Sequence, residues 1–565
     1  MSDLFENYAA DMAVAAAYDE MYTADRQVRP GYDRIGGVLD DLSLSDVNTR
    51  ADSMARSFLD RGVTFDFAGE ERPFPLDIVP RVITAGEWDV IERGVKQRVR
   101  ALECFLDDVY GEQRVVAEGI VPKALITSSA HFHRSVWGFR PAGGVRIHVA
   151  GIDVVRDRQG VFRVLEDNVR VPSGVSYVIE NRRAMTKGLP EAFMSQPIRA
   201  VEAYPRHLYK ALRATAPEAA EDPTVVVLTP GVFNSAYFEH TLLAGLMGVE
   251  LVEGRDLVVR GDKVYMRTTD GEQRVDVIYK RIDDEFIDPL HFRSDSVLGC
   301  SGLVNAARAG NVTIANAIGN GVADDKLTYS YVPDLIRYYL DEEPVLPNVD
   351  TYRLEEDEAR AWVLEHLDEL VVKPVDGSGG KGLVIGPQAT EAELQELRAK
   401  VLADPRGWIA QPVLQLSTVP TFTDGEFSPR HVDLRPFAVN SGDEVYVLPG
   451  GLTRVAMQKG SLIVNSSQGG GSKDTWVLGQ PQTQDLDPGQ APPPDVDSSV
   501  HTWPVSASWQ DEGDSGQQQQ QQQVVSGPGV VSAAAPATAD TAETTTAKTT
   551  AATTATTRTG EGPTC

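Results

Sequence analysis

The chain has 565 residues, which at about 100–200 residues per domain leaves room for roughly two to four domains and a sizeable buried core. Its formal net charge is −29 at pH 7, and this excess of acidic residues argues against nucleic-acid binding through a generally basic surface. No run of about 18 apolar residues occurs, so no membrane-spanning helix is predicted.

The amino-terminal sequence and the cysteines indicate a cellular location. Residues 1–20 carry acidic side chains where a secretory signal carries Lys or Arg, and they lack the apolar core of such a signal. Cys104, Cys300 and Cys565 are far apart and show no CxxC spacing, so neither a zinc site nor a disulfide framework is predicted. We therefore expect a cytoplasmic protein. Cys104 and Cys300 stand in apolar, helix-like sequence and are expected in the core.

A long amphipathic helix is predicted near the start of the chain. Apolar residues recur at spacings of three and four from Trp88 to Val109, which is the pattern of a helix that packs one face against a core. We expect residues 1–120 to form a mainly helical region.

Two strands joined by a tight turn are predicted next, over residues 148–157 and 161–168. Their pairing would bring Asp153 close to Glu166 and Asn168, which share one strand face because they are two residues apart. Two carboxylates and an amide oxygen suit Mg²⁺ held jointly with substrate phosphates. The alternative is that these acids are solvated or paired with arginines. Three arginines are near in sequence: Arg156, Arg163 and Arg170.

The middle of the chain predicts a strand, a helix and a strand over residues 224–259, as in a buried βαβ unit. A further helix is expected after Asp325, which stands at its start. Further strands are expected over residues 370–373, 382–385, 408–414, 431–439 and 444–451.

A glycine-rich turn separates the strands predicted at 370–373 and 382–385. Its sequence formally matches GxGxxG, but a dinucleotide-binding turn opens a helix, whereas here a β-like segment follows. A P-loop is also excluded, because Lys381 is followed by Gly382. Two interpretations remain: a flap whose backbone N–H groups close over phosphates while Lys373 supplies a fixed charge, or an ordinary glycine-rich hairpin.

Arginines cluster near the end of the predicted fold. His431, Asp433 and Arg435 alternate along a strand and share one face, and Arg454 follows on a neighbouring strand. We expect Asp433 to orient Arg435, with both arginines binding a phosphoryl group or a carboxylate. A salt bridge across the sheet face is the alternative. Beyond residue 478 the sequence becomes Pro-, Gln- and Thr/Ala-rich, and residues 479–565 are expected to be disordered.

The order of several residues resembles the nucleotide-binding half of ATP-grasp ligases: Lys326, Lys373, Gln411, Asp433-Leu434-Arg435 and Arg454. In that superfamily the acidic Glu-x-Asn strand normally comes last, whereas here Glu166-Asp167-Asn168 comes first. This order resembles the circularly permuted ATP-grasp proteins, the group that includes the synthetase part of glutathionylspermidine synthase. The runs VLEDNVRVPSGVSYVIENR, TPGVFNSAYFEH and VNSSQGGGSKDTW look like the type 2 branch.

The resemblance implies a role for each matching position. Lys326 and Lys373 would contact ATP phosphates, and Gln411 would lie in the adenine hinge. Arg435 and Arg454 would steady the γ-phosphoryl group or an acyl phosphate. The flap would be formed by Gly377, Ser378, Gly379 and Gly380. The ligands of Mg²⁺, usually two ions, would be Asp153, Glu166 and Asn168.

One position departs from the pattern of glutathionylspermidine synthase, which has an arginine two residues before the first metal-binding aspartate. Gly151 stands at that position here. The catalytic arginine is then either supplied from elsewhere, with Arg281 and Arg170 as candidates, or absent.

The fold implied is an α+β or α/β, circularly permuted ATP-grasp fold with mixed and antiparallel sheets, a helical amino-terminal region and a disordered tail. We predict five regions: 1–120, mainly helical; 121–223, the metal-binding strands; 224–320, an α/β subdomain; 321–478, the nucleotide-binding lobes; and 479–565, the tail.

The implied activity is ATP-dependent ligation of a carboxylate to an amine through an acyl phosphate, on a peptide or polyamine-like substrate. The alternatives are a non-catalytic nucleotide- or partner-binding scaffold and a phosphotransferase. The resemblance also suggests alpha-E and transglutaminase-like proteins as partners. The acidic net charge and the lack of a long apolar run predict neither nucleic acid nor a membrane as a partner.

Overall fold

The computed structural model describes residues 3–5, 8, 17–67, 70–376, 382–464 and 469–479, all within one unit of the chain, Met1–Gly527. The predicted flap residues Gly377, Ser378, Gly379 and Gly380 lie outside the described residues, as does the predicted tail beyond residue 479. None of the helices in the described ranges is long and apolar enough to cross a membrane.

The amino-terminal region is mainly helical, as predicted. Its elements are η1 (Asp3–Phe5), α2 (Asp33–Asp40), α3 (Leu44–Asp60), β1 (Thr64–Phe67), β2 (Glu70–Pro73), β3 (Arg81–Ile83), α4 (Ala85–Val109), α5 (Arg114–Ala117), α6 (Lys123–Thr127) and η2 (Arg134–Val136). The long helix predicted over 88–109 is α4, which begins with a capping box between Thr84 and Glu87. The prediction of a core position for Cys104 was wrong, because this residue is exposed; Cys300 is buried.

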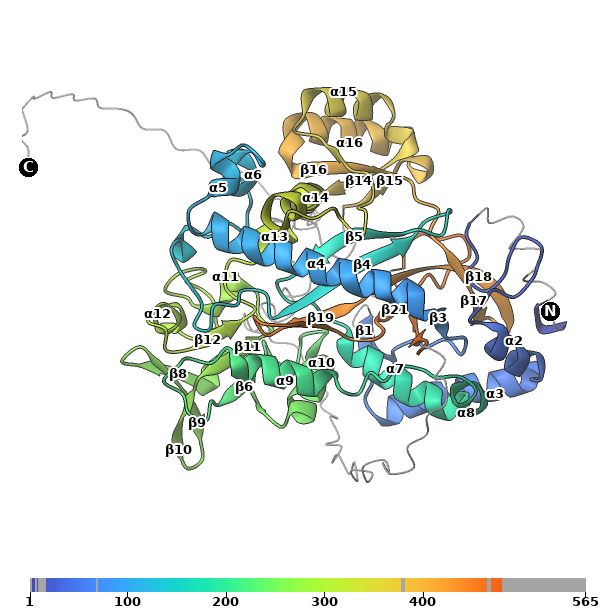
Figure 1. Ribbon diagram of the computed structural model, residues 1–565, viewed down its shortest axis with the longest axis horizontal. Helices are drawn as coiled ribbons and strands as arrows, with labels where there is room; N and C mark the ends of the chain where they lie inside the picture. Colours follow the sequence, from blue (N-terminus) through green and yellow to red (C-terminus); the bar gives the residue numbers. More distant parts are fainter. Residues whose placement is uncertain are drawn as a thin grey trace, which may run out of the picture. The chain divides into compact units, whose positions relative to one another are not determined.

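A central antiparallel sheet combines strands from distant parts of the chain. Its strands are β4 (Val149–Arg156), β5 (Phe162–Asn168), β17 (Thr418–Thr423), β18 (Glu426–Arg435), β19 (Phe437–Asn440), β20 (Val445–Val447), β21 (Leu452–Val455) and β22 (Gly471–Lys473). The strand order is β20-β19-β4-β18-β21-β22, with β5 paired to β4 and β17 paired to β18. Strand β4 therefore lies between two strands that follow it by more than 250 residues, and Figure 1 shows the two colours side by side.

A four-stranded parallel sheet contains the predicted βαβ unit. Its order is β12-β11-β6-β7, and helix α10 connects the parallel neighbours β6 and β7. The bounds are β6 (Val225–Leu228), α10 (Tyr237–Met247), β7 (Glu250–Val252), β11 (Val277–Lys280) and β12 (Thr313–Ala315). A three-stranded meander follows β7: β8 (Leu257–Arg260), β9 (Lys263–Thr268) and β10 (Gly271–Val275).

Several helices surround these two sheets. They are α7 (Val175–Gly188), α8 (Pro190–Met194), α9 (Tyr204–Ala214), η3 (Gly254–Asp256), α11 (Asp284–Ile287), α12 (Leu303–Arg308), α13 (Gly321–Asp324) and α14 (Lys326–Leu340). The largest hydrophobic cluster runs from α4 and α14 into both sheets, with Leu106, Leu335, Ile152 and Ile278 among its buried members. The last strand, β23 (Thr475–Val477), pairs in parallel with β3.

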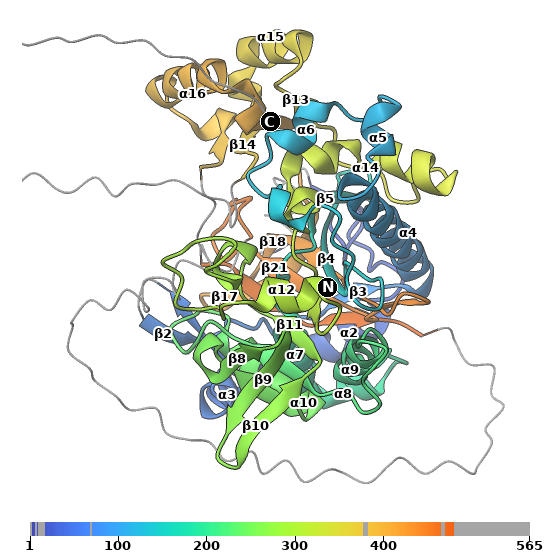
Figure 2. The ribbon, with the colours of Figure 1, turned by 90° about the vertical axis from the view of Figure 1, so that its left-hand side faces the viewer.

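A small lobe is built from the segment after α14. Its sheet has the order β13-β16-β14-β15, and the buried side chains of its helices and strands form a separate hydrophobic cluster. The elements are β13 (Tyr352–Arg353), α15 (Asp357–Glu365), η4 (Leu367–Glu369), β14 (Leu370–Pro374), β15 (Val384–Ile385), η5 (Gly386–Gln388), α16 (Glu391–Ala403), η6 (Pro405–Gly407) and β16 (Trp408–Pro412). Figures 1 and 2 both show α15 and α16 on one side of this sheet and β5 on the other. The predicted domain boundaries remain predictions.

Candidate active site

The predicted acidic residues meet on one face of the hairpin formed by β4 and β5. Asp153 pairs with Glu166 and Gly151 pairs with Asn168 across the two strands. Because directly opposed residues of an antiparallel pair point to the same side, the three polar side chains share that face. The turn predicted between the strands is present, closed by a hydrogen bond from the Gly160 N–H to the Asp157 carbonyl.

Two arginines from later strands hold the carboxylate of Asp153. The Nη2 atoms of Arg435 and Arg454 each lie 2.8 Å from Asp153 Oδ2. Burial alone would raise the pKa of Asp153, but the two guanidinium charges outweigh it and lower the pKa to about 2. Asp433 does not bond to Arg435 as predicted; its carboxylate bonds to Arg454, with Arg454 Nε 2.9 Å from Oδ1. The carboxylate that Arg435 holds belongs to β4 rather than to its own strand.

The side chain of Arg435 also explains the glycine at position 151. A Cβ atom built on Gly151 would lie 3.1 Å from Cδ of Arg435 and 3.1 Å from Cβ of Pro172. The stem of Arg435 thus crosses the space above Gly151, and its guanidinium reaches Asp153 from there. A guanidinium is therefore present beside Asp153 although residue 151 does not supply it.

The two arginines proposed from sequence for this position have other partners. Arg170 bonds to Asp324, with Nε 2.8 Å from Oδ2. Arg281 bonds to Glu239 at 2.8 Å and donates to the Pro172 carbonyl at 2.8 Å. In the described part of the chain, neither side chain makes a hydrogen bond or ion pair with Asp153 or Glu166.

The two predicted lysines approach the acidic face from the lobe side. Lys326, the first residue of α14, places Nζ 3.0 Å from Glu166 Oε1. Lys373 on β14 donates to Gln411 Oε1 at 2.7 Å, and Gln411 Nε2 donates to Thr351. Burial is the main cause that lowers the pKa of Lys373 to about 8, with Glu166 acting in the opposite direction.

The structure thus brings together charged residues that are far apart in the sequence. Glu166, Lys326 and Asp153 are among the charges that influence the pKa of Lys373, so all four groups lie within electrostatic range of one another. Acidic residues from the first third of the chain and cationic residues from the later part converge, as the resemblance implied. Their roles in binding and catalysis remain proposals.

The donor set fits Mg²⁺ in chemistry. Asp153, Glu166 and Asn168 carry side-chain oxygen atoms at neighbouring positions of two paired strands, and Mg²⁺ prefers oxygen ligands. The side-chain Nδ2 of Asn168 is buried and has no hydrogen-bond partner, so its amide is not tied to another protein group at that end. No cluster of three or more His, Cys, Asp or Glu side chains within the described ranges is arranged around a metal position. The Asp153 carboxylate bonds to arginines instead.

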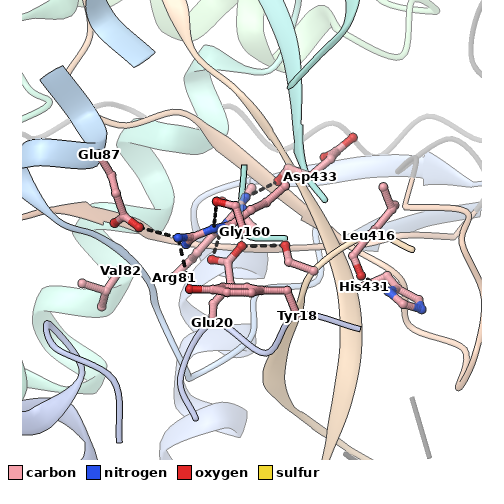
Figure 3. Close-up of polar contacts among 12 residues, drawn as sticks. Tyr18, Glu20, Arg81, Val82, Glu87, Gly160, Leu416, His431 and Asp433 are labelled. Carbon is pink, nitrogen blue, oxygen red and sulfur yellow. Dashed lines mark hydrogen bonds and ion pairs between the residues drawn. The ribbon is translucent and has the colours of Figure 1, made fainter. Parts of the chain in front are cut away.

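A buried charge network, which the sequence did not predict, contacts the strand that carries Asp433. Arg81 on β3 is fully buried, bonds to Glu20 at 2.6 Å and 2.8 Å, and donates to the Asp433 carbonyl at 2.9 Å. Ser417 Oγ donates to Glu20 at 2.6 Å. Figure 3 shows these contacts beside β18. Arg81 and Glu20 follow no periodic pattern, so only the folded structure reveals that they support the strand that carries Asp433.

A cavity of about 390 Å³ opens beside the same strand. Residues from the lobe, from the connection after β16 and from the central sheet line it. They include Ile385, Val413, His431 and Leu462. The cavity is therefore bordered by both the lobe and the sheet that carries the arginines.

One protein-family model matches residues 80–456 of the chain, and its description is circularly permuted ATP-grasp, type 2. The chain belongs to this family. The match covers the acidic hairpin, both lysines, Arg435 and Arg454, and it confirms the circularly permuted ATP-grasp fold expected from the sequence.

Relatives of this ATP-grasp protein occur in several bacteria. An uncharacterized protein of Mycobacterium tuberculosis is 60% identical over 475 residues, 84% of this chain and 86% of that protein. A Frankia alni protein named "Putative glutamate--cysteine ligase 2-3" is 48% identical over 468 residues, which are 82% of this chain but 54% of that longer protein.

A solved structure of a glutathione synthetase-like effector from Globodera pallida, in its apo form, resembles the fold with a TM-score of 0.52 at 12% identity. The alignment covers 78% of this chain and 98% of the effector. At this identity the resemblance concerns the fold alone.

Proposed function

We propose that this ATP-grasp protein is an ATP-dependent carboxylate–amine ligase that works through an acyl phosphate. The observation that carries the proposal is the convergence of Asp153 and Glu166 with Lys326, Lys373 and Arg435 in one region. Phosphoryl transfer depends mainly on positioning and on stabilisation of charge on the transferred group. A set of fixed cations beside two carboxylates supplies both.

In this proposal the lysines hold the triphosphate, and the nucleoside lies in the cavity lined by Ile385 and Val413. Asp153, Glu166 and Asn168 would hold Mg²⁺, which when bound would neutralise charge on the phosphate oxygens. Arg435 and Arg454 orient the substrate carboxylate towards the γ-phosphorus.

Two steps follow from this arrangement. A carboxylate oxygen of the substrate forms a bond to the γ-phosphorus as the bond to ADP breaks. The nitrogen of an amine then attacks the acyl carbon, phosphate leaves, and the amine loses a proton. Arg435 neutralises the charge that develops on the acyl phosphate. The products are an amide, ADP and phosphate.

Two sources support ligation over the alternatives. The stem of Arg435 crosses the space above Gly151 and its guanidinium bonds to Asp153, which supports a catalytic site although residue 151 is not an arginine. The name of the Frankia relative describes a reaction of the same class, although the match covers only 54% of that protein. A peptide or polyamine-like substrate remains an expectation from the resemblance.

Isotope transfer tests the proposal. Fractions of a bacterial metabolite extract are first screened for compounds that make the purified full chain release phosphate from ATP. The active acid is then supplied with ¹⁸O in its carboxylate. We expect phosphate release to require both acid and amine, with ¹⁸O from the carboxylate found in the phosphate. A stable phosphorylated substrate would instead establish a phosphotransferase, and ATP binding without any release would establish a scaffold.

A further inference from the structure

The cavity beside β18 contains one polar side chain whose orientation is fixed by the sheet. His431 lines the cavity and is 8% exposed. It lies on β18 on the same face as Asp433 and Arg435, because alternate residues of a strand point to the same side. The strand therefore connects the cavity directly to the guanidinium that holds Asp153.

The length of this connection matches an extended nucleotide. His431 and Arg435 are four residues apart, which at about 3.3 Å per residue is roughly 13 Å. A nucleoside triphosphate spans a similar distance from its nucleoside to its γ-phosphate. With the γ-phosphate beside Arg435, the nucleoside lies at the level of His431.

The hydrogen bonding of the imidazole determines what it offers to a ligand. His431 Nδ1 lies 2.8 Å from the carbonyl oxygen of Leu416, and a carbonyl oxygen can only accept, so Nδ1 carries the proton. Burial lowers the pKa of His431, which favours the neutral ring. Nε2 is then an acceptor on a side chain that lines the cavity. Figure 3 shows Nδ1 directed at Leu416 and the ring turned away from the Glu20–Arg81 network.

We propose that His431 determines nucleotide specificity by accepting, at Nε2, a hydrogen bond from a donor group of the nucleoside, either the base amine or a ribose hydroxyl. This inference rests on the proposed function, since it takes ATP as the ligand. It adds a residue that the resemblance did not assign, and it gives a defined protonation state to the nucleoside end of the site.

Two substitutions distinguish the contributions of the two ring nitrogen atoms of His431. In His431→Asn the amide can keep the bond to Leu416 but has nothing at the position of Nε2. In His431→Gln the side chain places an acceptor near Nε2 but loses the bond to Leu416. The matched control is His366→Asn, because His366 Nδ1 also bonds a backbone carbonyl, that of Trp362 at 2.7 Å, and His366 does not line the cavity.

The test measures dissociation constants by calorimetry for a non-hydrolysable magnesium–ATP analogue and for magnesium tripolyphosphate. Loss of one hydrogen bond predicts that His431→Asn weakens the analogue about five- to tenfold. We expect tripolyphosphate affinity to change less than twofold, and His431→Gln and His366→Asn to remain near the wild type. Analogues that lack the base amine or the 2′-hydroxyl identify the donor, because His431→Asn will not weaken the analogue that lacks it.

Two results overturn the inference while leaving the proposed function intact. One is unchanged analogue affinity in His431→Asn. The other is an equal loss of analogue and tripolyphosphate affinity, which would place the effect at the phosphates. If the wild type binds neither ligand, the proposed function itself fails.

Discussion

The proposed role of Lys373 links ATP binding to pH, and this link can be measured. Burial lowers the pKa of this lysine from 10.5 to about 8 in the protein without ligand. A bound phosphate would restore the charged form, because an adjacent anion favours the ammonium. ATP binding at pH 8 should therefore take up about half a proton, and at pH 7 about 0.1 proton, as follows from a pKa of about 8.

The same shift gives the sign of the effect on stability. The folded state binds fewer protons than the unfolded state between pH 8 and 10.5, so this group makes stability rise with pH across that window. Below pH 8 the buried charge costs at most about 3 kcal/mol. Replacing Lys373 by Met removes this cost. It also leaves the side-chain Oε1 of Gln411 without its donor, which lowers the free energy of unfolding by about 1 kcal/mol. We therefore expect Lys373→Met to raise the free energy of unfolding by about 1–2 kcal/mol at pH 7.

Titration calorimetry in two buffers with different ionisation enthalpies measures the proton uptake. The variant Lys373→Met should show no uptake and bind ATP at least tenfold more weakly, since a charge-assisted hydrogen bond contributes about 1.5–3 kcal/mol. Lys400→Met is the control, because Lys400 lies on α16, is 54% exposed and pairs with Glu396. The reasoning is refuted if the wild type takes up no proton at pH 8, or if Lys373→Met takes up as many.

Three other substitutions give distinct outcomes. Glu166→Gln should abolish magnesium-dependent turnover yet lower the free energy of unfolding by less than about 1 kcal/mol, because its ion pair is partly exposed; normal magnesium dependence would contradict this. Gly151→Ala should reduce turnover by displacing Arg435, whose Cδ would lie 3.1 Å from the new methyl group; unchanged kinetics would argue against that contact. Arg281→Met should destabilise the protein by about 3–5 kcal/mol on denaturant unfolding, since it leaves Glu239 buried and unpaired; full stability with lost turnover would favour a catalytic role instead.

Much of the local structure could be predicted from the sequence because it depends on short-range patterns. The helical spacing from Trp88 to Val109 predicted α4, and the turn at Asp157–Gly160 predicted that β4 and β5 pair. The pairing of Asp153 with Glu166 also depends on a shift of register between Asp153 and Val154, which the sequence did not predict. Asp325 caps α14 through the Leu327 N–H, as its position before the helix indicated. In each case the sequence pattern and the structural element it predicts lie within about 25 residues of each other.

The partners of the charged side chains could not be predicted in the same way. Alternation along β18 put Asp433 and Arg435 on one face, but which carboxylate each arginine contacts depends on the neighbouring strands. Strand β4, nearly 300 residues earlier, lies next to β18, so Arg435 meets Asp153. Cys104 shows the same limit within a helix, since apolar sequence around it did not determine which side faces solvent.

The most direct test of a shared magnesium–triphosphate site is a crystal structure with Mn²⁺ and a non-hydrolysable ATP analogue, with the metal located by its anomalous scattering. We predict a manganese peak between Asp153, Glu166 and the phosphate oxygens, with Lys326 and Lys373 bonded to the triphosphate. A nucleotide bound away from these carboxylates, or a metal that contacts neither of them, would contradict the account.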